Sequence, residues 1–269
     1  MTSVDMGVDS RDTGAFAGAT GWIEEIGFAA MTLASCLALY LRILLGKARL
    51  DVPAFAASLR QAGLSILPAI TLVTASVGLI IGHQIEAILN QLDLPGLILL
   101  TVTYATVLEL VPILVGILVA GRAGVALAVR QATLTVTGEM DGLLVNGIHP
   151  IQFTVGPVLL AMLLMSFAFV IWGTLVTFAA AGFWLWGMTG VSPALFLEAL
   201  RRALDVPTLI EALVKPLLFA LLIALIATVN GTAAGRNPEG IARAATRTMI
   251  GAVAAILVTD LLYILLLRV

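Results

Sequence analysis

The sequence predicts an all-α integral membrane protein with five transmembrane helices, preceded by a further N-terminal helix. Of the 269 residues, 61% are hydrophobic and only 11% are charged, against about 25% charged in soluble domains. The mean hydropathy is +1.11. Several apolar runs exceed the ~20 residues that a helix needs to cross the hydrocarbon core. The polar remainder is too short for a separate soluble domain, so we expect one membrane domain.

The N-terminal part of the chain is the least apolar. Residues 1–20 are small, polar and acidic without helical period, so we expect a flexible tail. The region 21–63 follows. Its apolar run, residues 27–45, is interrupted by Arg42 and is followed by Lys47, so this helix either spans the bilayer or lies in its interface.

Residues 64–269 carry the predicted spans, which we place at residues 64–89, 95–120, 151–187, 209–229 and 249–267. The run 151–187 is nearly twice the ~20 residues required, so its helix projects beyond the bilayer or bends. Between the second and third spans, residues 122–150 mix small, polar and charged residues. This segment does not suit lipid, yet it holds too much apolar surface for water, so we expect it to dock on the membrane domain or a partner.

The basic residues indicate which loops face the cytoplasm. Eight lie in loops on one side and three on the other: Lys47, Arg49, Arg60, Arg122, Arg130, Arg236, Arg243 and Arg247 against Arg201, Arg202 and Arg268. Because Lys and Arg concentrate in cytoplasmic loops, residues 122–150 are predicted to be cytoplasmic.

The most informative motif is Glu109-Leu110-Val111-Pro112, inside the second span. An acidic residue at the centre of a span costs about 2.5–3.5 kcal/mol on insertion scales, so it is a functional candidate. Glu109 would contact a substrate or gate a cavity; the alternative is a carboxylate that serves only helix packing. Pro112 cannot donate to the carbonyl of Leu108, which frees one acceptor and favours a kink.

Asp260 poses the same problem in the last span. Its helical neighbours Thr259 and Tyr263 can satisfy it, and packing and functional roles stay equally open. For the small-residue pair Gly78 and Gly82, and for Gly116 with Ala120, helix packing is the better interpretation.

Several functional classes are disfavoured. A net charge of −2 gives no basic field for nucleic acid, and His83 with Glu86 is better explained as an interfacial polar cluster than as a metal site. Gly46-Lys47 is not part of a phosphate-binding loop, and there is no G-x-S-x-G motif, so the chain should not hydrolyse ATP alone. A membrane enzyme remains a minor alternative.

Several motifs in order resemble those of a known family. They are Leu108 to Pro112, Val119 to Leu127, Gly147 to Pro150, Asn230-Gly231, Gly240 to Thr248, and Asp260. Over about residues 50–267 the chain is similar to the MlaE (YrbE) permeases, membrane subunits of ABC-type phospholipid transporters associated with MCE proteins. The resemblance implies an N-terminal interfacial helix, five spans and a cytoplasmic coupling segment, residues 122–150.

The resemblance also implies partners and site residues. The permease would form a homodimer in the bacterial inner membrane, with cytoplasmic ATPases that bind ATP and Mg, a periplasmic MCE-domain protein and, in many systems, a STAS-domain protein. No cofactor would bind to this chain. The lipid cavity or gate would include Glu109, Leu110 and Pro112. ATPase coupling would involve Gly121, Arg122, Gly124, Glu139, Asp141, His149 and Pro150. Apart from the resemblance, the four-residue spacing of Arg243 and Arg247 places them on one helical face, where they are predicted to form a cytoplasmic basic surface or to bind lipid head groups.

The chain departs from the family pattern mainly in the coupling segment. Val111 replaces a glycine, Arg130 replaces an acidic residue, and His149 replaces an aspartate. The family's Thr-Glu-Gln is replaced around Gly138-Glu139. These changes bear on the ATPase contacts and allow a specialised paralogue.

Together with the resemblance, the sequence predicts a permease that moves a phospholipid, whose head group stays open, between the inner membrane and a periplasmic carrier, powered by partner ATPases. Two alternatives stay open. One is a proton-coupled secondary transporter that uses Glu109 and Asp260, although no inverted repeat is visible. The other is a non-transporting membrane scaffold.

Overall fold

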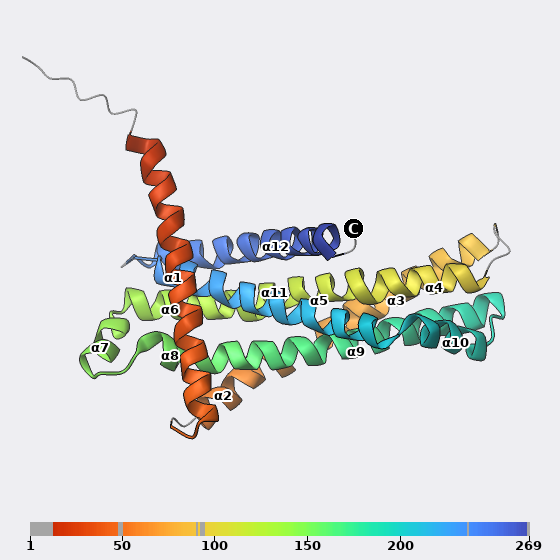
Figure 1. Ribbon diagram of the computed structural model, residues 1–269, viewed down its shortest axis with the longest axis horizontal. Coiled ribbons are helices and arrows are strands. Elements are labelled where there is room, and N and C mark those ends of the chain that lie inside the picture. The colour runs from red at the N-terminus through yellow and green to blue at the C-terminus, as the bar shows by residue number, and fades with distance from the viewer. Residues whose placement is uncertain (1–12, 48–50, 90, 92–94, 236, 268–269) are drawn as a thin grey trace, which may run out of the picture.

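The structure is a computed structural model that describes residues 13–47, 51–89, 91, 95–235 and 237–267 (Figure 1). Every regular element in these residues is a helix. The elements, with η for a π-helical turn, are α1 Thr13–Leu44, α2 Val52–Leu59, η1 Arg60–Leu64, α3 Leu67–Leu89, α4 Pro95–Ala105, η2 Thr106–Leu110, α5 Val111–Val119, η3 Ala120–Gly124, α6 Val125–Val136, α7 Glu139–Val145, α8 Pro150–Thr154, α9 Gly156–Thr189, α10 Pro193–Ala203, α11 Val206–Thr232 and α12 Glu239–Leu267.

The all-α membrane class is confirmed. In the described part of the chain, six helical segments are long and apolar enough to cross a membrane. Five of them overlap the five predicted spans, one each, and the sixth, Ile23–Leu44, is the apolar part of α1. Most of the predicted tail, residues 1–12, lies outside the described residues, but α1 begins within it, at Thr13.

The long helices run side by side, whereas α1 crosses them (Figure 1). Helix α3 packs on α9, and α11 packs on α6, α9 and α12. Helix α1 contacts α8 and α11, and the Tyr40 hydroxyl donates a hydrogen bond to the carbonyl of Gly156 at 2.7 Å. If the long helices cross the bilayer, α1 lies nearer its plane, which favours the interfacial alternative.

The helix that carries the second predicted span does not end near residue 120. The helix continues through Gly121 and Gly124 to Val136, giving an apolar segment, Leu97–Val136, of 40 residues. Gly124 does not break it because this residue is buried against α11, where an added Cβ would lie 2.5 Å from Ile223 Cγ2. At ~1.5 Å per residue the segment is about 60 Å long, twice the hydrocarbon thickness, so part of it must project beyond the bilayer.

The predicted segment 122–150 is therefore mostly a helix extension followed by one short helix. Its first part, α6, packs within the bundle against α11 and α12. The chain first turns at Gly138, where φ is +77°, and then forms α7. Whether residues 122–150 lie in the cytoplasm stays a prediction.

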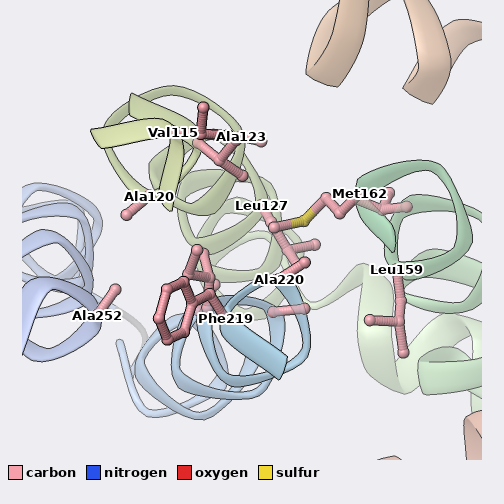
Figure 2. Close-up of a cluster of buried hydrophobic side chains, with 14 of the residues drawn as sticks. Val115, Ala120, Ala123, Leu127, Leu159, Met162, Phe219, Ala220 and Ala252 are labelled. Carbon is pink, nitrogen blue, oxygen red and sulfur yellow. The ribbon is translucent and has the colours of Figure 1, made fainter. Parts of the chain in front are cut away.

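The bundle core forms where α5, α6, α9, α11 and α12 meet (Figure 2). Small and large residues are mixed there, with Ala120, Ala220 and Ala252 around Phe219, and Met162 pointing toward Leu127 from the other side. Small side chains let membrane helices approach closely, which maximises van der Waals contact. Gly116 belongs to the same region, since a Cβ added to it would lie 3.2 Å from the Phe219 ring.

Glycines also join α3 to α9. A Cβ on Gly78 would overlap the backbone carbonyl oxygen of Thr177, and one on Gly82 would lie 2.8 Å from Trp184 Cβ. At the same end of α3, the Trp184 indole donates a hydrogen bond to Glu86 Oε2 at 2.8 Å. The His83 ring packs edge-on against Trp184. This polar group therefore fixes the end of the α3–α9 pair.

The two ends of the bundle differ in the elements they contain (Figure 1). Helices α6, α7 and α8 and the start of α12 lie at one end, which we call the basic end because Arg130, Arg243 and Arg247 are on these elements. Helix α10, with Arg201 and Arg202, lies at the other. Of the basic residues in the loop comparison, Arg49, Arg236 and Arg268 lie outside the described residues.

Candidate functional site

Three charged side chains from three different helices meet inside the bundle. The Lys215 ammonium on α11 donates hydrogen bonds to Glu109 Oε2 at 2.8 Å and to Asp260 Oδ1 at 2.9 Å. Glu109 comes from η2 and Asp260 from α12. We call these three residues the charge cluster. An isolated charge in a membrane interior is costly, and mutual pairing is how such residues are retained there.

The cluster also uses a backbone acceptor. The Lys215 Nζ atom donates to the carbonyl oxygen of Leu108 at 2.9 Å. In a regular helix this carbonyl would accept from the N–H of residue 112, but Pro112 has none. The acceptor that the sequence predicted to be free is therefore the one that Lys215 reaches, and the three ammonium protons match three acceptors.

The members of the cluster differ in exposure. The Lys215 side chain is 1% exposed, that of Asp260 is 8% and that of Glu109 is 22%. The Lys215 Nζ atom also lies 4.8 Å from the centre of the Tyr263 ring, a cation–π distance. Lys215 and Asp260 thus form a buried pair, whereas Glu109 is the member that a molecule outside the bundle can reach.

Two prolines lie beside the cluster. Pro112 follows Glu109 by less than one turn, and Pro216 directly follows Lys215 inside α11. Each removes one backbone hydrogen bond from its helix, and proline sites are where helices bend. A change in the pairing of the charged groups would therefore act on α5 and α11 next to their prolines, where these helices bend most easily.

Lys215 was missed by the sequence reasoning, which read residues 209–229 as plain apolar sequence. The sequence does contain a signal for it, because a lysine inside an apolar span requires an acidic partner, and Glu109 and Asp260 are acids in two other spans. Asp260 pairs with Lys215, which the sequence reasoning did not name as its partner, and Tyr263 lies against the same ammonium group. That Thr259 and Tyr263 help to satisfy Asp260 stays a prediction.

The other predicted cavity residues lie beside the cluster. Leu110 is 38% exposed and Pro112 is buried. None of the predicted coupling residues belongs to the charge cluster. Arg122 lies thirteen residues beyond Glu109 in the same helical run, which separates their backbones by about 20 Å.

The predicted coupling residues lie toward the basic end. Gly121 and Arg122 are exposed and Gly124 is buried. Glu139 and Asp141 are exposed in the first turn of α7. The remaining two residues begin α8, with His149 exposed at its N-cap and Pro150 buried. The coupling segment is thus held in the structure by buried residues near its two ends, Gly124 and Pro150, while the charged residues between them are exposed.

Arg243 and Arg247 are exposed near the start of α12. Only Arg247 of the two lines a groove that α12 forms with α1 and α11. Among the described residues, no group of three or more His, Cys, Asp or Glu side chains is placed to hold a metal ion.

Comparison with known proteins identifies the family of this chain. The sequence model of the family described as Permease MlaE matches residues 55–266. A probable ABC transporter permease protein of Rickettsia typhi is 26% identical over 202 residues, which cover 74% of this chain and 77% of the relative. A probable ABC transporter permease protein of Pyropia yezoensis is 25% identical, over 71% of this chain and 73% of the relative.

A chloroplast protein of Arabidopsis thaliana, named trigalactosyldiacylglycerol 1, is 26% identical over 56% of this chain and 43% of that protein. The family match spans all five long apolar segments after α1 and includes every member of the charge cluster. The chain therefore belongs to the MlaE permease family and is a multi-pass permease subunit of the ABC transporter type.

Proposed function

We propose that this permease moves a phospholipid between the bacterial inner membrane and a periplasmic MCE carrier, with energy from ATP hydrolysis in a partner ATPase. The observation that carries this proposal is the charge cluster, a group of charged side chains inside a largely apolar bundle. The family membership supports the ABC mechanism. The name of the Arabidopsis relative, which contains that of a glycolipid, supports a lipid cargo.

Glu109 is the proposed contact for the lipid head group. It is the most exposed member of the cluster, and the apolar side chain of Leu110 lies beside it. A head-group ammonium would compete with Lys215 for the Glu109 carboxylate, and a phosphate would attract Lys215. Either event would weaken a contact between η2 and α11 beside Pro112 and Pro216, and so allow the spans to move.

The proposed contact with the ATPase is α7 and the turn after it. Leu144 is 59% exposed, Val145 is 87% and Ile148 is 40%, and apolar residues exposed together at a surface outside lipid mark an interaction site. In the full assembly we place a second permease copy beside this one, the ATPases at the basic end, the MCE protein at the other end, and a STAS-domain protein in some systems.

The test is ATP-driven lipid transfer by the complex reconstituted into vesicles, with wild type and Glu109→Gln compared. A charge-assisted hydrogen bond contributes about 1.5–3 kcal/mol, so transfer should fall tenfold or more, with the complex still assembled. Glu198→Gln is the matched control, because Glu198 is exposed on α10 and pairs only with a neighbour on the same helix in the described structure, Arg202.

Equal transfer by wild type and Glu109→Gln would contradict the proposed role. Flux that requires a pH gradient but no nucleotide would instead support the secondary transporter. Stable assembly without any lipid flux would support the scaffold.

A further inference from the structure

A groove of about 680 Å³ lies between α1, α11 and α12. Its wall is apolar and comes mainly from α11 and α12, with Leu222, Leu225, Ile226, Val229 and Ile250. This size is in the range of small-molecule sites, which are typically ~300–1,000 Å³. The groove does not include any residue of the charge cluster.

The polar residues of the groove lie toward one end. Asn230 is near the end of α11 and Arg247 is near the start of α12, so both are toward the basic end. From Asn230 the apolar wall extends along α11 to Leu222, about 12 Å at 1.5 Å per residue. A ligand that fits this pattern has a polar head and an apolar chain.

The charged residues of the groove indicate which polar head group a ligand would carry. Glu25 of α1 and Arg247 of α12 line the same groove, and both are exposed. Among the residues that the structure describes, the ion pairs involve neither of them. An arginine binds phosphate oxygens through its planar fork of donors, and a carboxylate pairs with an ammonium group. A zwitterion supplies both partners at once, whereas an anionic head group would leave Glu25 facing like charge.

We propose that this groove binds a zwitterionic phospholipid of the leaflet at the basic end, with the phosphate at Arg247, the ammonium at Glu25 and an acyl chain along α11. The inference rests on the lipid cargo of the proposed function and adds a place where the lipid enters the permease. The crossing position of α1 supports this, because a helix near the bilayer plane holds Glu25 close to the level of the head groups.

The test is retention of lipid by the full-length protein, purified from vesicles that contain equal amounts of phosphatidylethanolamine and phosphatidylglycerol, and measured by native mass spectrometry. Wild type should retain mainly phosphatidylethanolamine. Arg247→Gln should lower total retention about fivefold, the factor expected for one basic residue at an anionic group. Glu25→Gln should lower the ratio of phosphatidylethanolamine to phosphatidylglycerol two- to fivefold, as for a single exposed ion pair.

The matched controls are Arg201→Gln on α10 and Glu24→Gln on α1, which remove the same charges from exposed residues that do not line the groove. Both should retain lipid like wild type. Ala29→Trp, which fills the groove from the α1 side, should lower retention of both lipids.

Unchanged retention in Arg247→Gln and Ala29→Trp would overturn the proposal, as would equal losses in the control variants. Loss of a permease dimer in the groove variants, without bound lipid in wild type, would assign the groove to a second copy. Retention needs neither ATP nor an ATPase, so a groove that binds lipid in a complex without transport would refute only the proposed function.

Discussion

Replacing Lys215 with methionine should destabilise the bundle more than any other single loss of charge. The variant keeps a long side chain in a site where Lys215 is 1% exposed, but it removes the donor for Glu109, Asp260 and the Leu108 carbonyl. Removing one partner of a buried ion pair costs about 3–5 kcal/mol, because the remaining charge stays buried. The free energy of unfolding should fall by that amount.

The measurement is unfolding of the purified protein from mild detergent by added dodecyl sulfate, followed by circular dichroism. Lys47→Met is the control, since Lys47 is the chain's other lysine and is exposed after α1. The double variant Lys215→Met/Asp260→Leu removes both buried charges and should recover at least half of the loss, because well-packed apolar groups can replace a buried pair. A loss below about 1 kcal/mol in Lys215→Met, or one no larger than in Lys47→Met, would refute this reasoning.

Three further predictions follow from other contacts. Gly78→Ala should lower the free energy of unfolding by about 1–3 kcal/mol, because its Cβ overlaps the backbone of α9, whereas Gly187→Ala, with no atom within 4 Å, should not; equal midpoints in the dodecyl sulfate titration would contradict this. Asp205 caps α11, and its carboxylate accepts hydrogen bonds from the Thr208 side chain and, as a smaller contribution, from the Thr208 backbone amide. These hydrogen bonds lower the pKa of the Asp205 carboxyl group in the folded state. The stabilisation is therefore present at neutral pH and is lost as the pH falls below about 4. When the pH of the buffer is lowered from 5 to 3, the thermal midpoint of wild type should therefore fall more steeply than that of Asp205→Asn. Parallel curves would count against this role of Asp205. Leu144→Asp on α7 should reduce co-purification of the ATPase, while Leu197→Asp, exposed on α10 at the other end, should leave it unchanged; the opposite result would move the ATPase contact away from α7.

The fold class could be predicted because it depends on run length and hydropathy, which a single sequence contains. The end of the helix that carries the second span could not be predicted. Gly121 and Gly124 look like helix breakers, yet a glycine packed on a neighbouring helix serves close approach instead, and only the position of Ile223 distinguishes the two cases.

The charge cluster was half predictable. Glu109 and Asp260 are recognisable as buried acids in apolar spans, and Pro112 predicts a free carbonyl at Leu108. Their meeting point depends on Lys215, which is 106 residues from Glu109 and 45 from Asp260 along the chain. No local pattern gives contacts at such separations, so their geometry had to come from the packing of three helices.

The order of synthesis gives the cluster a role in membrane insertion. When α11 is inserted by the translocation machinery, Glu109 has already been made but Asp260 has not. Glu109 of η2 can therefore supply the first counter-ion for the lysine, and α12 can supply the second only after Asp260, 45 residues further along the chain, has been made. A nascent chain that lacks Glu109 would have to hold an unpaired ammonium group until α12 is made, and we expect the quality-control proteases of the membrane to degrade it more often.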